Sequence, residues 1–183
     1  IAEYADVFDE LTKNGDEVIH FSLSSGISST YHNAVLAAED NGKVHVVDTK
    51  SLTTGIALLI LRAVELIDHG MSAAAVEIEC NRLVSKVKTT FIVSDLEFLY
   101  RGGRCSGVAA LGANVLGIKP SIAMNDEGTL IVDKKYRGKM ESCISSYIDD
   151  LLKADKNNID TDTAILVRTA GISNETFAMA RKK

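Results

Sequence analysis

The chain has 183 residues, and 46% of them are hydrophobic, which is enough to bury a core in one large or two small domains. Its formal net charge is −5, so it offers no basic face that would make nucleic acid its main partner. The longest apolar run, from Gly55 to Leu61, is too short to cross a bilayer. These features argue against nucleic-acid binding and against stable membrane insertion.

The cysteines and histidines do not form a recognisable site. The three cysteines, Cys80, Cys105 and Cys143, are odd in number and far apart, which predicts a reduced, cytoplasmic setting and no disulfide framework or zinc site. The four histidines are also scattered, without the spacing of metal ligands. We therefore expect no metal in this chain.

The first half of the chain alternates between helical and strand patterns. Apolar residues recur at helical spacing in residues 1–13, 31–40, 52–69 and 73–87, and short apolar runs at 18–23 and 44–48 are typical of buried strands. The helix at 52–69 is apolar nearly all round, which predicts that it is packed between layers. Together these elements predict a parallel sheet covered by helices on both faces.

A serine-rich turn, Ser22 to Tyr31, joins the first strand to the next helix and contains five serines and a threonine. Hydroxyl groups and free backbone N–H groups at a helix N-terminus suit an anion. The turn has no lysine, so it is not a phosphate-binding P-loop of the usual kind. The alternative is that Ser28 or Ser29 caps the helix and that the rest is a solvated turn. A second polar turn, Asp48 to Ser51, follows the second strand, and ligands of parallel sheets bind at such strand ends.

The pattern changes near Lys88–Thr89, where we place a domain boundary that separates residues 1–88 from 89–183. Beyond it we expect a strand at 89–94, a short helix at 95–100 and a helix rich in small residues at 106–116. Strands at 118–124 and 129–136 are joined by the hairpin signal Asn125–Gly128. A helix near 140–151, a strand at 164–168 and a last helix capped by Ser173 complete a predicted mixed sheet with helices on one face.

Several spaced segments resemble the motifs of the DegV family of bacterial fatty-acid-binding proteins. Residues Ser24–Tyr31 resemble the family's Ser-Ser-Gly-Leu-Ser-Gly-Thr-Tyr turn, and Val47–Ser51 resembles its Val-Asp-Ser segment. Residues Asp95–Arg104 resemble its Leu-Glu-Tyr-Leu–Gly-Gly-Arg motif. Segments 118–120 and 136–139 also have similar counterparts in the family, so the resemblance covers almost the whole chain.

The resemblance implies a two-domain DegV-like α/β fold, with a parallel-sheet three-layer domain and a mixed-sheet two-layer domain. It implies a long-chain fatty acid bound between the domains, with no cofactor and no catalysis by this chain itself. A separate fatty acid kinase would phosphorylate the bound carboxylate, and the acyl phosphate would enter phospholipid synthesis in the bacterial cytoplasm.

Site residues follow from the same resemblance, position by position. Ser28 is the first choice for the contact with the fatty-acid carboxylate, and Ser25, Ser29 and Thr30 support it in the turn. Arg104 matches the glycine-flanked arginine of the family and is expected at the surface that docks the kinase. The alternative for Arg104 is an exposed arginine that ends a helix, because exposed arginines are common.

Three departures from the family pattern bear on the site. The family's Thr-Ser-Gln-Pro-Ser motif, whose threonine binds the carboxylate, would lie before Ile1, and its C-terminal region with a histidine near the carboxylate would lie beyond Lys183. We therefore expect both ends to belong to a longer protein. Ser29 also stands where the family usually has glycine, and its side chain either crowds the backbone N–H or adds a hydroxyl.

A head group held by hydroxyl and N–H groups, without a lysine, would stay hydrogen-bonded and chemically accessible. The alkyl tail needs apolar walls, and each buried CH₂ contributes roughly 0.8 kcal/mol. Residues 52–69 and 106–116 are candidate walls, and ordinary core packing is the alternative for each.

Two other functions remain open at this point. The serine turn and Asp48 could serve an enzyme that acts on a phosphosugar, because the related two-domain architecture occurs in dihydroxyacetone kinases. Against this, the spacing indicates no Ser–His–Asp set, Cys–His set or metal cluster. A regulatory domain that responds to an acyl ligand is the third possibility, although no segment resembles a helix-turn-helix with a basic recognition helix.

Overall fold

The computed structural model describes residues 1–104, 117–154, 160 and 162–183. The chain forms two compact units. The first unit contains Ile1–Thr89 together with Met124–Thr129, and the second contains Thr90–Ala123 and Leu130–Lys183.

The helices and strands divide between the two units. The first unit holds α1 (Ala2–Thr12), β1 (Val18–Ser22), α2 (Thr30–Ala38), β2 (Val44–Asp48), α3 (Thr54–Asp68) and α4 (Ala73–Val84). The second holds β3 (Thr90–Ile92), α5 (Glu97–Gly102), β4 (Ile118–Met124), β5 (Leu130–Arg137), α7 (Met140–Ala154) and α8 (Asn174–Lys182).

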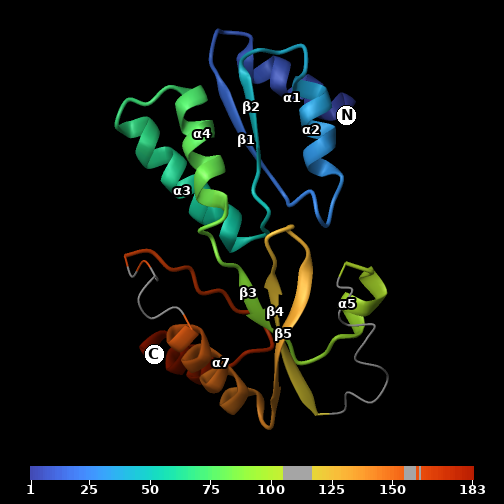
Figure 1. The fold of residues 1–183 in the computed structure, drawn as a ribbon, viewed down its shortest axis with the longest axis vertical. Coiled ribbons are helices and arrows are strands. Elements are labelled where there is room, and N and C mark those ends of the chain that lie inside the picture. Colours follow the sequence, from blue (N-terminus) through green and yellow to red (C-terminus); the bar gives the residue numbers. More distant parts are fainter. Residues whose placement is uncertain (105–116, 155–159, 161) are drawn as a thin grey trace. The chain divides into compact units, whose positions relative to one another are not determined.

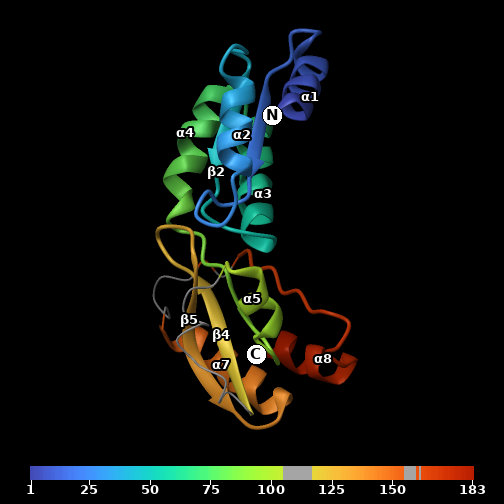
Figure 2. The same cartoon turned by 90° about the vertical axis from the view of Figure 1, so that its right-hand side faces the viewer.

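The sheet of the first unit is parallel, as predicted. Strand β1 pairs with β2 from Val18 opposite Val44 to Ser22 opposite Asp48. Helices α1 and α2 cover one face of this pair, and α3 and α4 cover the other (Figure 1 and Figure 2). This arrangement is the three-layer architecture that alternating strands and helices predict, and it brings the carboxyl ends of both strands to one edge.

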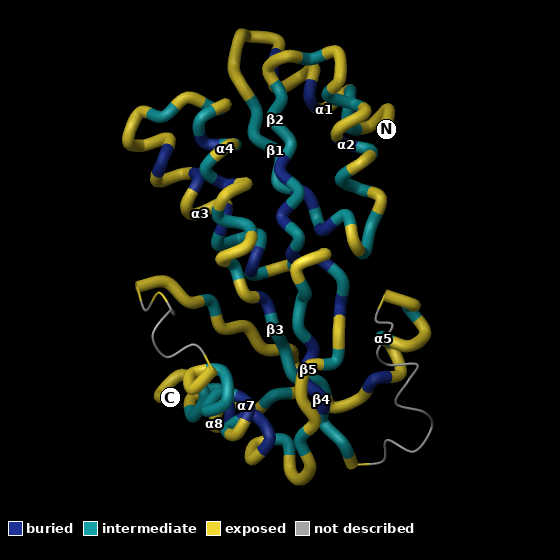
Figure 3. The backbone as a smooth tube through the Cα atoms, viewed as in Figure 1, coloured by how far each residue is buried: buried dark blue, intermediate teal, exposed yellow. Residues whose placement is uncertain are grey.

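The core of the first unit lies between β2 and the α3–α4 layer. Its buried residues are Val47, Ala63, Leu66, Val76 and Cys80, and they give the dark stretches of β2, α3 and α4 in Figure 3.

Helix α3 differs from its prediction, because its apolar surface is covered on one side only. Leu59 and Ala63 are buried, whereas Leu61 and Val64 are 50% and 49% exposed. Since residues four apart share a helix face, Leu59 and Ala63 form the packed face. Within the described residues, α3 is therefore not enclosed between two layers, although its sequence is apolar nearly all round.

The sheet of the second unit has the strand order β3-β4-β5. Strand β3 runs antiparallel to β4, with Phe91 opposite Ile122, and β4 turns into β5 at the predicted hairpin. Helix α7 packs on β5 and α8 packs on α7, and the Tyr147 hydroxyl donates to Thr90 Oγ1 at 3.1 Å to join α7 to β3. The α/β fold class with two different sheets is thus confirmed.

The predicted strand at 164–168 is wrong. These residues form neither strand nor helix, and Leu166 and Val167 are 47% and 67% exposed. Apolar residues of high strand propensity become a strand only when a neighbouring backbone supplies hydrogen bonds, and no such ladder joins this segment to the described strands. The sheet described for the second unit is consequently antiparallel. The predicted helix at 106–116 lies outside the described residues, as does Cys105.

Candidate functional site

Two polar turns begin next to each other at the carboxyl end of the parallel sheet. The register pairs Ser22, the last residue of β1, with Asp48, the last residue of β2. The segment Ser22–Thr30 is called the serine turn below, and Asp48–Thr53 is called the β2 turn. In open parallel sheets, ligands bind beyond the strand carboxyl ends, so this pair of turns is the first place to look for a site.

Buried hydroxyl groups join the two turns into one structure. The Thr49 hydroxyl donates to the Ser22 carbonyl at 2.7 Å, and the Ser24 N–H donates to the Ser51 carbonyl at 3.0 Å. The Ser51 and Thr89 hydroxyls lie 2.6 Å apart and share a hydrogen bond. Because buried polar groups need partners, this network fixes how the β2 turn sits against the serine turn.

A charged pair connects the same turns closer to solvent. Lys50 Nζ lies 2.9 Å from Asp48 Oδ2 and donates to Ser25 Oγ at 2.7 Å. Asp48 Oδ1 accepts hydrogen bonds from the backbone N–H groups of Ser25 (3.1 Å) and Lys50 (3.2 Å). Burial raises the pKa of the Asp48 carboxyl, but the hydrogen bonds from Ser25 and Lys50 outweigh burial and hold that pKa below its usual value. Asp48 is therefore a stable carboxylate at neutral pH.

The hairpin turn Asn125–Gly128 contacts the other side of the serine turn. The Ser24 hydroxyl donates to the Gly128 carbonyl at 2.7 Å. A Cβ placed on Gly26 would lie 2.6 Å from the Gly128 carbonyl oxygen and 2.7 Å from that of Glu127, so the backbones approach too closely for any side chain. Gly128 itself has φ +75°, a left-handed conformation that glycine adopts without strain. The serine turn is thus held between the β2 turn and the hairpin turn.

Of the predicted site residues in the serine turn, Ser29 is exposed, and Ser25, Ser28 and Thr30 are half-buried. The Ser28 N–H donates to the Ser24 carbonyl at 3.1 Å, and Ser28 Oγ accepts from the Thr30 N–H at 3.2 Å, a bond that leaves the hydroxyl hydrogen of Ser28 for another acceptor. Ser29 occupies the N-cap position of α2, but its side chain makes no capping hydrogen bond. The Thr30 hydroxyl accepts from Ser22 Oγ at 3.3 Å. Ser25, Ser28, Ser29 and Thr30 thus lie in one turn, and their role in ligand binding stays a prediction.

The chemistry of this site favours an anion. The N-terminus of α2 carries partial positive charge and unpaired N–H groups, and the Ser28 hydroxyl just before it keeps a hydrogen to donate. The Lys50 side chain is paired with Asp48 and donates to Ser25 Oγ, so in this arrangement it holds Ser25 in place.

Comparison with known proteins identifies the family. The family model described as "Uncharacterised protein, DegV family" matches residues 1–180. This chain belongs to the DegV family. A DegV domain-containing protein of Caldanaerobacter subterraneus subsp. tengcongensis is 32% identical over 142 residues, which are 76% of this chain and 50% of that protein. The chain spans about half the length of the curated relatives it matches.

Two solved structures that share the fold are described as fatty-acid-binding. A DegV protein of Thermus thermophilus, described by its fatty acid binding, is 33% identical with a TM-score of 0.70, over 85% of this chain and 54% of that one. A stearic-acid-binding protein of Eubacterium ventriosum is 29% identical with a TM-score of 0.72, over 86% of this chain and 56% of that one. The fatty-acid binding in these descriptions is a property of those two proteins.

The sequence of this DegV chain did not reveal Lys50 as part of the site. The serine turn itself has no lysine. The sequence places the polar turn Asp48–Ser51 where ligands of parallel sheets bind, but it gives a role there to Asp48 alone, in a phosphosugar enzyme. Lys50 enters from the β2 turn, 25 residues along the chain from Ser25. The available signal was the parallel pairing of β1 with β2, because adjacent parallel strands place their carboxyl-terminal turns together.

Arg104 lies in the second unit and is exposed. It follows α5, which ends at Gly103 in the left-handed conformation (φ +66°), and its guanidinium donates to the Gly102 carbonyl at 2.6 Å. Such a C-terminal glycine explains the Gly-Gly-Arg pattern structurally. The docking role of Arg104 stays a prediction.

Helix α3, a candidate wall for an acyl tail, lines an apolar groove of about 640 Å³ beside β1. Its lining is Glu17, Ile19, His20, Phe21, Ile60, Ala63, Val64, Ile67, Met71, Ser72 and Ala73. Burial lowers the pKa of His20, which therefore stays neutral at pH 7 and adds no charge to the groove. No residue of the serine turn beyond β1 lines it, so the groove is a separate feature from the polar site. The other candidate wall, 106–116, lies outside the described residues.

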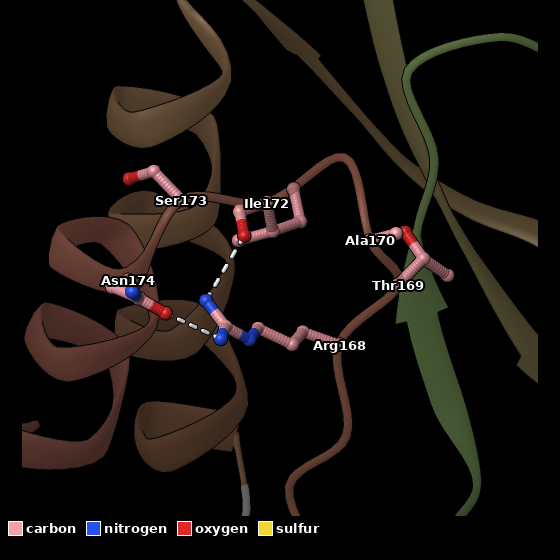
Figure 4. A pocket seen from close by; sticks show the side chains of 6 residues that line it. All are labelled: Arg168, Thr169, Ala170, Ile172, Ser173 and Asn174. Carbon is pink, nitrogen blue, oxygen red and sulfur yellow. Dashed lines mark hydrogen bonds between the residues drawn. The ribbon is translucent and has the colours of Figure 1, made fainter.

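The second unit has a cavity of about 340 Å³ lined by Arg168, Thr169, Ala170, Ile172, Ser173 and Asn174 (Figure 4). The Arg168 guanidinium donates to the Ile172 carbonyl at 3.0 Å and to the Asn174 side chain, as Figure 4 shows. It also lies 4.9 Å from the centroid of the Phe177 ring. These contacts hold the segment before α8 in place, so we assign this cavity a structural role.

Within residues 1–104, 117–154, 160 and 162–183, no group of three or more His, Cys, Asp or Glu side chains is arranged to hold a metal ion. The same residues include no helix with the length and apolar character needed to cross a membrane.

Proposed function

We propose that this DegV chain binds the carboxylate of a long-chain fatty acid at the serine turn. The observation that carries the proposal is the convergence of Ser25, Ser28 and the α2 N-terminus at the carboxyl ends of β1 and β2, in a chain whose solved relatives are described as fatty-acid-binding. In this proposal the Ser28 hydroxyl donates to the head group, and Ser25, Ser29 and Thr30 shape the turn around it. No cofactor takes part.

The acyl tail supplies most of the binding free energy in this proposal. Each CH₂ removed from water contributes roughly 0.8 kcal/mol, whereas a hydrogen bond to a charged group contributes about 1.5–3 kcal/mol. The serine turn therefore orients the head group more than it holds the lipid. A head group bound only by neutral donors keeps its charge and its nucleophilic oxygens.

We further propose that a separate fatty acid kinase phosphorylates the bound carboxylate in the cytoplasm and that the acyl phosphate enters phospholipid synthesis. The family resemblance implies this partner, and the exposed surface of α5 is consistent with a docking role. Phe98 and Tyr100 are 82% and 63% exposed there, a few residues before Arg104. Exposed aromatic residues beside an arginine are typical of interface hot spots.

The first experiment measures lipid in the full-length protein. Purified from bacteria and denatured, it should release a long-chain fatty acid that mass spectrometry identifies. Ser28→Ala should weaken fatty-acid retention by about tenfold, because a charged hydrogen bond is lost. Ser146→Ala, an exposed serine on α7, is the matched control and should retain lipid normally. Repeated absence of lipid, with none taken up when offered, would overturn the proposal, as would turnover of a phosphosugar.

The second experiment separates docking from lipid binding. Arg104→Glu should slow phosphorylation of the bound fatty acid by the kinase at least tenfold while lipid retention stays unchanged, because reversing a charge at an interface costs about 1.4 kcal/mol or more. Lys135→Glu, an exposed charge reversal on β5, is the control. An unchanged phosphorylation rate in Arg104→Glu removes Arg104 from the docking surface.

A further inference from the structure

Lys50 has a backbone conformation that its residue type does not favour. Its φ is +46°, in the left-handed region that glycine and asparagine adopt more readily than lysine. Thr53, three residues later, also has a positive φ of +41°. Strained conformations of this kind persist where the surrounding structure over-determines them and are frequent at functional sites. We therefore look to the contacts of the Lys50 side chain to explain why a lysine is kept in this backbone conformation.

The side chain of Lys50 closes a ring of contacts between the two turns. One oxygen of Asp48 binds the backbone N–H groups of Ser25 and Lys50, and the other binds the Lys50 ammonium, which donates in turn to Ser25 Oγ. The Asp48 side chain is only 12% exposed, against 37% for Lys50, so water screens this pair less than a surface ion pair. The ring fixes both the backbone and the hydroxyl of Ser25.

Fixing Ser25 fixes the part of the turn that carries Ser28. The Ser24 carbonyl accepts the N–H groups of Ile27 (3.2 Å) and Ser28 (3.1 Å), so residues 24–28 form one hydrogen-bonded turn. Ser24 anchors the start of this turn to Gly128. The Asp48–Lys50 pair supplies the second anchor one residue later, at Ser25. Without the anchor at Ser25, the turn that carries Ser28 is held mainly at Ser24, by the Gly128 and Ser51 carbonyls.

We infer that Lys50 is a positioning residue for the head-group site: its ammonium, held by Asp48, locks Ser25 and thereby sets the position of Ser28. This inference rests on the proposed function, in which the Ser28 hydroxyl donates to the fatty-acid head group. Lys50 does not bind the carboxylate here, because its charge is matched by Asp48 and one of its hydrogens is used by Ser25. It acts through the serine turn.

The test uses the full-length protein and two readouts. Lys50→Met keeps most of the side-chain volume and removes the charge, so amide hydrogen exchange at Gly26, Ile27 and Ser28 in the lipid-free protein should accelerate about tenfold or more, since hydrogen bonds to charged groups are lost. Fatty-acid affinity should fall by a similar factor. Lys50→Arg, which keeps the charge, should recover more than half of both.

Two further variants keep the test decisive. Asp48→Asn removes the other charge of the pair and should give the same exchange pattern. If Lys50→Met folds poorly, Asp48→Asn takes its place in the test. Lys43→Met changes an exposed lysine just before β2, at the opposite end of the strand, and should alter neither readout.

Each outcome decides between the two claims. Faster exchange together with weaker lipid binding supports the positioning role. Unchanged exchange in Lys50→Met and Asp48→Asn overturns it, and so does weaker lipid binding with unchanged exchange, which would mean that Lys50 contacts the head group directly. If the wild-type protein takes up no fatty acid, the proposed function fails, and the exchange data on lipid-free protein still decide whether Lys50 positions the turn.

Discussion

Two serine-containing loops of this chain each lead into a helix, yet they are stabilised in opposite ways. The loop before α8 is held by its own side chains: Ser173 Oγ accepts from the Thr176 N–H at 3.1 Å, and Arg168 binds the Ile172 carbonyl and Asn174. The serine turn before α2 is held from outside, by Gly128 and by the Asp48–Lys50 pair, and its N-cap residue Ser29 makes no capping bond.

The difference shows where donors remain for a ligand. Ser173 Oγ accepts from the Thr176 N–H and also donates to Thr176 Oγ1, so its hydroxyl hydrogen is used within the loop. Ser28 Oγ accepts from the Thr30 N–H and keeps its hydroxyl hydrogen for a ligand. Serine content alone does not distinguish these cases. The partners of each hydroxyl do, and they can be tested separately in the two loops.

The largest effect is expected at Gly26, where the serine turn meets the hairpin turn. Gly26→Ala places a Cβ 2.6–2.7 Å from the carbonyl oxygens of Glu127 and Gly128, and backbone atoms cannot move aside as a side chain can. Forced repacking of this kind costs about 1–3 kcal/mol. Urea unfolding should show this loss of stability, together with loss of retained fatty acid.

Gly42→Ala is the matched control, because nothing lies within 4 Å of a Cβ at that position. Its effect on the free energy of unfolding should stay within about 0.5 kcal/mol. Equal stability of the two variants would mean that the serine turn is not held by the hairpin turn.

An intermediate effect is expected from the two N-cap serines. Ser173→Ala should lower the free energy of unfolding by about 1 kcal/mol, because the α8 cap is lost. Ser29→Ala should change it by less than about 0.5 kcal/mol, because Ser29 makes no capping bond. Thermal or urea unfolding of both variants measures this contrast, and a reversed order would contradict the distinction between the loops.

The smallest effect is a pH dependence that belongs to Asp48. The pKa of this carboxyl is lower in the folded protein than its ordinary value of 3.8, so the unfolded chain takes up the proton first as pH falls. The stability that Asp48 contributes is complete above pH 3.8 and is lost as pH falls through the lowered pKa. Unfolding free energies measured between pH 7 and pH 2 should therefore fall less steeply at the acid end in Asp48→Asn.

Other carboxylates titrate in the same range, and the pKa values of Glu79 and Glu175 are also lowered, mainly by hydrogen bonds from Arg82 and from the Glu175 backbone. Only the difference between the wild-type and Asp48→Asn curves isolates Asp48. Parallel curves would show that the Asp48 pair does not stabilise the folded turn.

Local signals in the sequence predicted most of the fold. The cap at Ser173, the hairpin at Asn125–Gly128 and the alternation around β1 and β2 all formed as expected. Each depends on residues within a few positions of one another. The strand at 164–168 failed because a strand also needs a partner that its own residues do not specify.

The site was predicted less completely, for the same reason. The resemblance pointed to the serine turn, but contacts that hold it come from Lys50 and from Gly128, the latter 104 residues away from Ser24. Contacts over such separations depend on how the chain folds back, and no local pattern in the turn encodes them. Gly26 is part of a recognisable motif, but the reason for its small size became visible only when the hairpin turn lay against it.

The pairing of Lys50 with Asp48 also has a chemical consequence for the proposed function. An acyl phosphate is a mixed anhydride, and a neutral amine beside it would attack its carbonyl carbon and become acylated. Lys50 Nζ lies 2.9 Å from Asp48 Oδ2 and donates to Ser25 Oγ at 2.7 Å, so two contacts within the turns restrain it. In the proposed function, this restraint keeps the lysine from reaching the carbonyl carbon of the acyl phosphate.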